Sequence, residues 1–209
     1  MSLYPVTLAS LVIAHTITFS TMSVAAPDLQ NAVRSWEKEG FLLSTNKSLL
    51  SIPAMNSAFD SDYMYWASPL PTSVMQRLID SCLCLGLYKT DAMSVPAAAE
   101  SPQTFPEDRQ TEEQIGFARI VTDYTTFAYL TDVYVVPAYR GLGLGGWMLD
   151  AVDELLGELP YLRWAMLRTS MEKSKIAYRQ RLGMNVLEGA DNGQGDPCMM
   201  GRKGPALRG

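Results

Sequence analysis

Apolar residues recur along this chain with two different periods, and the period separates predicted strands from predicted helices. Short stretches that alternate apolar and polar positions, or short apolar runs bounded by turn residues, predict strands. The predicted strands are 41–45, 83–88, 115–121, 127–136, 162–169, 185–188 and 198–202. The polar segment 123–126 joins two of them as a hairpin, so these two strands should be antiparallel.

Apolar residues at helical spacing predict four helices. The clearest carries Leu144, Met148 and Val152, begins inside a glycine-rich stretch and ends near Leu159-Pro160. The other three are 53–59, 71–80 and 172–182, the last stopped by Gly183. The order β-α-α-β-β-β-α-β-α-β-β, with no internal repeat, predicts an α/β (α+β) fold.

Two stretches fall outside this pattern. Residues 90–113 are mostly Ala, Pro, Glu, Ser and Thr and predict a flexible insert between strands. Residues 1–35 predict an N-terminal extension to a domain over 36–209. Three interpretations of the uncharged segment 3–26 stay open: a disordered or loosely packed extension, a true start at Met22, or a membrane or secretory targeting segment.

Composition and charge exclude several kinds of function. A chain of 209 residues, 47% hydrophobic and 19% charged, predicts one soluble globular domain. A net charge of −5 offers no basic field, so no nucleic-acid partner is expected. No stable membrane partner is expected either. The cysteines, Cys82, Cys84 and Cys198, show no metal spacing, and with His15 as the only histidine no metal site is expected. Cys82 and Cys84 should be buried in a strand. A cytoplasmic location is expected.

The segment 135–146 carries the most chemistry, because an apolar strand there runs through an arginine-glycine loop into a helix. Such a turn directs free backbone N–H groups and the positive end of a helix dipole at one place. Glycines let a phosphate approach the main chain closely, which predicts a site for a phosphate-bearing cofactor. The residues assigned to this site are Arg140, Gly141, Leu142, Gly143, Leu144, Gly145 and Gly146.

Two other interpretations of these glycines are open. Gly141-x-Gly143-x-x-Gly146 also satisfies the dinucleotide fingerprint of a Rossmann fold. That fold needs an acidic residue at the end of the next strand, but the strand ends Leu167-Arg168-Thr169, and a hairpin precedes the loop. A purely structural glycine turn is the other interpretation, although it does not require Arg140.

Arg140-x-x-Gly143-x-Gly145 resembles the pyrophosphate-binding signature of the GNAT superfamily of acetyl-CoA-dependent N-acetyltransferases. The order of the elements and the segments 65–67, 81–88, 115–123 and 127–135 look like one subgroup of that superfamily. The resemblance implies a GNAT fold, with a mixed, mostly antiparallel central sheet flanked by helices, and acetyl-CoA as cosubstrate. It implies that acetyl-CoA lies where two central strands separate, paired with main-chain groups of Tyr134, Val135 and Val136.

Tyr178 is the candidate general acid, because the superfamily often keeps a tyrosine near the thioester sulfur on this helix. The common pattern places it four residues before a Gly-aromatic pair, whereas Tyr178 precedes Gly183-Met184 by five and Arg179 has the strict spacing. Packing beside Leu182 is the alternative role for Tyr178.

Asp132 is the candidate base or water-orienting group. It should lie between Leu130 and Tyr134 on one face of a central strand, where an unpaired carboxylate would be costly. With a two-residue turn at Tyr124-Thr125, Arg119 falls opposite Leu130 and diagonal to Asp132. A buried ion pair between Arg119 and Asp132 is therefore the alternative to base chemistry.

The acceptor side is less defined. Tyr63, Tyr65 and Trp66 are candidates for its wall, although aromatic residues at such positions also occur as core. The subgroup's Asp-Ala-His after the fifth strand is replaced here by the segment 170–174, which begins Ser-Met-Glu, so no acceptor preference carries over.

The sequence thus predicts an acyltransferase that moves an acetyl or short acyl group from acetyl-CoA to an amine. A small-molecule amine is the expected acceptor, attacked directly in a ternary complex, because no Cys or Ser is set beside a base. A non-catalytic acyl-CoA-binding protein and a protein or peptide N-acetyltransferase are the alternatives. A homodimer is left open.

Overall fold

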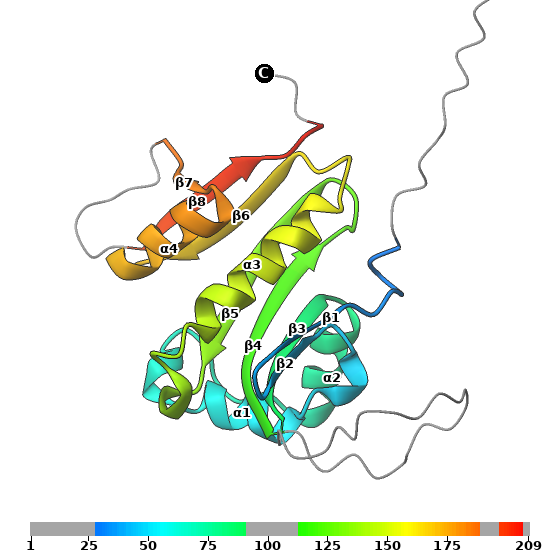
Figure 1. The fold of residues 1–209 in the computed structure, drawn as a ribbon, viewed down its shortest axis with the longest axis vertical. Coiled ribbons are helices and arrows are strands. Elements are labelled where there is room, and N and C mark those ends of the chain that lie inside the picture. The colour runs from blue at the N-terminus through cyan, green and yellow to red at the C-terminus, as the bar shows by residue number, and fades with distance from the viewer. Residues whose placement is uncertain (1–27, 91–112, 189–196, 207–209) are drawn as a thin grey trace, which may run out of the picture.

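Four α-helices and one eight-stranded sheet make up the part of the chain that the computed structural model describes, residues 28–90, 113–188 and 197–206 (Figure 1). The strand order is β1-β2-β3-β4-β5-β6-β8-β7. All neighbouring strands are antiparallel except the parallel pair β5 and β6. This is the mixed, mostly antiparallel sheet flanked by helices that the resemblance implied, so the predicted fold is confirmed.

The elements follow the predicted pattern closely. The helices are α1 (Ile52–Phe59), α2 (Thr72–Asp80), α3 (Leu144–Gly157) and α4 (Glu172–Leu182). The strands are β1 (Ser35–Lys38), β2 (Phe41–Ser44), β3 (Leu83–Lys89), β4 (Glu113–Thr122), β5 (Phe127–Val135), β6 (Trp164–Thr169), β7 (Asn185–Val186) and β8 (Cys198–Lys203). Three short 3-10 turns, η1 (Lys47–Leu49), η2 (Asp62–Met64) and η3 (Pro137–Tyr139), complete the list.

Two cores lie on opposite faces of the sheet. On the α3 face, apolar residues of α3 and Leu182 of α4 pack on strand residues such as Ile120 and Leu130. On the α1 face, α1 and α2 pack on Cys84, Phe117 and Tyr134. Cys82 and Cys84 are both buried, as predicted.

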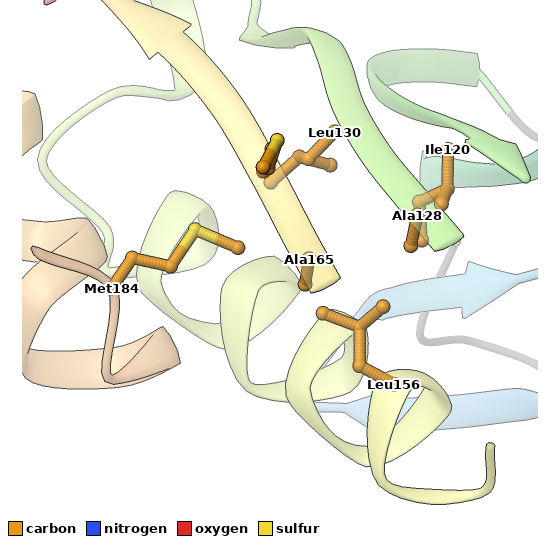
Figure 2. Close-up of a pocket in the computed structure, with 7 residues that line it drawn as sticks. Ile120, Ala128, Leu130, Leu156, Ala165 and Met184 are labelled. Atoms are coloured by element: carbon orange, nitrogen blue, oxygen red, sulfur yellow. The ribbon is translucent and has the colours of Figure 1, made fainter. Parts of the chain in front are cut away.

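Small residues bring α3 close to the sheet. In Figure 2 the short side chains of Ala128 and Ala165 face Leu156 of α3, with Met184 closing the layer. The space between these residues is too small to hold a water molecule. The centre of the α3 face is therefore solid core, and a ligand must bind elsewhere.

Strand β1 was not predicted. Its sequence, Ser-Trp-Glu-Lys, is largely polar and exposed because it forms the edge of the sheet. The turn to β2 uses Gly40 with a positive φ of 79°, a conformation that glycine adopts without steric cost.

The region before β1 also contacts the domain. Leu29 is buried in the α3-face core, and Arg34 forms an ion pair with Glu158 at 2.9 Å. Residues 1–27 and most of the predicted insert 90–113 lie outside the described residues, so those expectations stay predictions. Within the described ranges, no helix has the length and apolar character needed to cross a membrane.

Candidate active site

A cavity of about 790 Å³ opens where β5 and β6 separate. The two strands pair from Phe127 and Trp164 only as far as Leu130 and Leu167, yet both continue beyond that point (Figure 1). The cavity is lined by Tyr63, Tyr65, Trp66, Tyr129, Thr131, Asp132, Val133, Tyr134, Val135, Arg140, Arg168, Thr169, Ser170, Met171, Lys173, Ser174, Tyr178 and Pro197. The structure thus gathers both predicted catalytic residues and all three predicted acceptor-side aromatics around one space.

A β-bulge at Asp132 shapes the cavity. Between the pairs Arg119–Thr131 and Phe117–Tyr134, two residues of β5 stand opposite Ala118 alone. Asp132 accommodates the bulge with φ at +52°, in the left-handed region that Asp and Asn tolerate better than other side chains.

Beyond the bulge, the side chains of β5 alternate between the two cores in the opposite sense. Leu130 contacts the α3 face, whereas Tyr134 lies on the α1 face and Val135 packs toward the α3 face. The prediction that Leu130, Asp132 and Tyr134 share one face was therefore wrong, because one extra residue shifts the alternation of a strand.

The predicted hairpin register was also wrong by one residue. Arg119 lies opposite Thr131 rather than Leu130. The turn is longer than two residues because the Asp123 carboxylate accepts hydrogen bonds from the amides of Thr125, Thr126 and Phe127. Those bonds favour the charged carboxylate over the opposing effect of burial, and they hold the pKa of Asp123 well below its usual range.

Asp132 forms the ion pair that was the alternative to base chemistry. Arg119 Nε donates to Asp132 Oδ2 at 2.7 Å, and Thr131 Oγ1 donates to Oδ1 at 3.2 Å. Asp132 is buried, and Arg119 also contacts Cys82 Sγ at 3.6 Å. The Asp132 carboxylate lines the cavity, and Arg119, which does not line it, compensates the negative charge.

Replacing Asp132 with Asn is expected to lower the free energy of unfolding by about 1.5–3 kcal/mol, the usual worth of a hydrogen bond to a charged group. Asn keeps the left-handed backbone, so the change isolates the carboxylate charge. Urea unfolding measures the loss, and the double variant Asp132→Asn/Arg119→Met should recover part of it by removing the uncompensated cation. Unchanged stability in Asp132→Asn, or simple additivity in the double variant, would contradict a structural pair.

Tyr178 lies on α4 and faces the cavity. No hydrogen bond to its hydroxyl is found among the described residues, and burial raises the pKa of Tyr178 to about 12. The hydroxyl is therefore protonated at neutral pH and available as a donor. Arg179, which has the stricter family spacing, is exposed and does not line the cavity.

The arginine-glycine loop follows β5 through η3. Gly141 and Gly143 have φ of +87° and +75°, and a Cβ at either position would meet nothing within 4 Å. Gly143 is the N-cap of α3, and the first helical bond joins Trp147 N to Gly143 O at 3.1 Å. The amides of 141–146 have no hydrogen-bond partner in the described part of the chain, so they form the open cradle that the sequence predicted.

Two details of the loop differ from the prediction. The Arg140 amide already donates to Pro137 O at 3.2 Å, and its Nε donates to Val135 O at 2.9 Å. A Cβ on Gly146 would lie 2.8 Å from the Arg181 guanidinium, so the missing side chain of this glycine makes room for α4, while its amide stays unbonded in the described structure. The glycines with empty space where a Cβ would stand are Gly141 and Gly143.

The structure also limits which main-chain groups of 134–136 can pair with the pantetheine part of acetyl-CoA. Val136 N donates to Ile115 O at 2.8 Å, and Val136 O accepts from Tyr139 N at 3.0 Å, so Val136 is already bonded within the protein. In an antiparallel ladder, alternate residues direct their N–H and C=O to opposite edges. Val135 therefore presents its amide to the edge from which β6 has separated, while Tyr134 is directed toward β4.

The acceptor-side aromatics form one rim of the cavity. Tyr65 stacks edge-on against Trp66 at 5.0 Å, and its hydroxyl lies 2.8 Å from Ser170 Oγ. The Arg140 guanidinium lies over the Tyr63 ring at 4.8 Å. These contacts join the segment between α1 and α2 to the arginine-glycine loop and to the turn before α4. No role was predicted for Ser170, Arg168 or Lys173. In β6, Arg168 alternates with the buried Leu167 and so lies on the other face of the strand.

Comparison with known proteins agrees with this geometry. Residues 70–184 match the acetyltransferase (GNAT) family. A Gibberella zeae protein described as an acetyltransferase is 36% identical over 151 residues, which cover 72% of this chain and 82% of that protein. The chain therefore belongs to the GNAT acetyltransferase family, and it is an acetyltransferase of the family that uses acetyl-CoA.

Solved structures show the same fold. A GNAT-family protein of Xanthomonas campestris is 30% identical, with a TM-score of 0.52, and the match covers 73% of this chain and 89% of that one. Arabidopsis thaliana NAA60, solved with a bisubstrate analogue, is 14% identical with a TM-score of 0.50, and the match covers 75% of this chain and 94% of that one.

Proposed function

We propose that this protein transfers an acetyl or short acyl group from its CoA thioester to a primary amine on a small molecule. The observation that carries the proposal is the cavity at the β5–β6 separation, which extends from an aromatic rim to Arg140, the residue directly before the open amides of 141–146. In this arrangement residues 141–146 hold the diphosphate, and the Val135 amide faces the acyl carbonyl.

The chemistry follows from these positions. As the amine attacks, negative charge grows on the thioester oxygen, and a preplaced amide at Val135 stabilises that charge. Tyr178 donates a proton to the departing thiolate, since its raised pKa keeps it protonated, and the proton that the amine nitrogen loses passes through water to the phenolate and restores it. None of the three cysteines, all of them buried, lines the cavity in the described structure, which supports direct attack without an acyl-enzyme.

The rim supports a small acceptor over a peptide. The Tyr65–Ser170 contact bridges η2 and the turn before α4 and so narrows the opening on the acceptor side. A protein or peptide N-terminus would have to displace this contact, whereas a small amine would not.

Two measurements test the proposal. Acetyl-CoA at about 100 times its dissociation constant should stabilise the protein by about 2.7 kcal/mol, measured by thermal or urea unfolding. Amine-dependent release of free thiol should follow, with intersecting double-reciprocal lines for a ternary complex. Stabilisation without turnover of any amine would favour the acyl-CoA-binding alternative, and no stabilisation by CoA esters would exclude both.

A further inference from the structure

The acceptor side of the cavity carries positive charge that the protein does not neutralise. Four charged residues line the cavity: Asp132, Arg140, Arg168 and Lys173. Asp132 is compensated by Arg119, which lies outside the lining. Glu172, the acid next to Lys173 in sequence, pairs with Lys175 at 2.6 Å.

Arg168 and Lys173 are the cations left over. In the ranges 28–90, 113–188 and 197–206, neither makes an ion pair or a hydrogen bond through its side chain. Arg140 has its guanidinium placed over Tyr63 and bonded to Val135 O, so its position is fixed by the protein. A chain with net charge −5 thus gathers an excess of cations around this one space.

The positions of these cations assign them to the acceptor rather than to the diphosphate. Ala165 and Leu167 of β6 belong to the α3-face core, so the alternation of the strand directs Arg168 toward the other face. The amide cradle lies at the N-terminus of α3, and α3 packs on the same face of the sheet as Ala165 and Leu167. Ser170, two residues after Arg168, bonds to Tyr65 of the aromatic rim, and Lys173 follows in the first turn of α4.

We infer that the acceptor is a small primary amine that also carries an anionic group, a carboxylate or a phosphate, held by Arg168 and Lys173. This inference rests on the proposed acyl transfer to an amine and specifies its acceptor. Charge-assisted bonds to such a group are about twice as strong as neutral ones and orient the amine toward the thioester. The same cations repel polyamines and other acceptors rich in positive charge.

The test compares amines in pairs that differ by one anionic group. L-Phenylalanine with phenethylamine examines a carboxylate, and O-phosphoethanolamine with ethanolamine examines a phosphate. At saturating acetyl-CoA, kcat/KM for the amine that carries the carboxylate or phosphate should, in at least one pair, exceed that of the partner without it by about tenfold or more, the worth of a single charged hydrogen bond. The pair that shows the preference identifies the anionic group.

The protein side is tested with Arg168→Gln/Lys173→Gln, which should reduce that preference to about twofold. The matched control is Arg163→Gln/Lys203→Gln, which removes the same charge from two exposed residues outside the cavity and should keep the preference. A readout that does not depend on turnover is calorimetric titration with N-acetyl-L-phenylalanine or N-acetyl-phosphoethanolamine, whose affinity should fall only in the cavity variant.

The outcomes separate this inference from the proposed function. If the amines without an anionic group turn over as fast as their partners or faster, in both pairs, the anionic acceptor is overturned and acyl transfer still stands. Equal loss of preference in both double variants would also overturn it, because net charge alone would then explain the effect. Absence of thiol release with every amine would overturn the proposed function itself.

Discussion

Tyr178→Phe is expected to lower kcat about 100-fold, or about 2.7 kcal/mol in the activation barrier, with acetyl-CoA affinity unchanged within twofold. The hydroxyl faces the cavity without a hydrogen-bond partner among the described residues, so its removal costs the fold little. The ring stays and keeps its packing against the α3-face core. Steady-state kinetics and calorimetric titration of acetyl-CoA measure the two effects separately.

The pH dependence follows from the raised pKa. Burial favours the neutral phenol, so Tyr178 stays protonated below its pKa of about 12, and the wild-type rate should show no alkaline decline from this group between about pH 7 and 10. Arg179→Ala is the matched control, because that residue has the alternative family spacing but is exposed. An unchanged rate in Tyr178→Phe, or a comparable loss in Arg179→Ala, would remove Tyr178 from the mechanism.

Periodicity was sufficient to predict most of the fold. Helix α3, with its regularly spaced apolar residues, and the buried strand β3 lie where the pattern placed them. Strand β1 could not be predicted because an edge strand has few buried positions. Its stability comes from pairing with β2 rather than from its own side chains. Such pairing is a long-range property that local composition does not report.

The candidate site was predicted from the loop and from the family resemblance rather than from periodicity. The open backbone at Gly141 and Gly143 could be predicted because glycine commonly marks a positive φ. Asp132 gave no comparable signal, since an aspartate in a bulge looks like any polar residue in a strand. Its bulge nevertheless decides which of Leu130, Tyr134 and Val135 faces the cofactor side, so a sequence-based register could not assign the main-chain contacts correctly.

Gly143→Asp is expected to weaken acetyl-CoA binding about 100-fold, or about 2.7 kcal/mol. The position lies at the start of α3 with open space around its missing Cβ, so a carboxylate there would occupy the place that the loop amides leave for the diphosphate. Two like charges about 5 Å apart repel by roughly 0.8–3 kcal/mol at effective dielectric constants between about 80 and 20, and a diphosphate carries more than one charge.

Gly143→Asn supplies the control because Asn has nearly the same shape as Asp and also tolerates the φ of +75° found here. Its binding should stay several-fold tighter than that of the Asp variant, and the gap between the two should narrow as salt is raised from about 0.1 to 1 M, where the Debye length falls from about 10 to 3 Å. Both affinities are measured by calorimetric titration with acetyl-CoA, with circular dichroism to confirm that α3 is intact. Equal affinities in the Asp and Asn variants at low salt would mean that no phosphate approaches this loop, and the amide cradle would then be only the first turn of a helix.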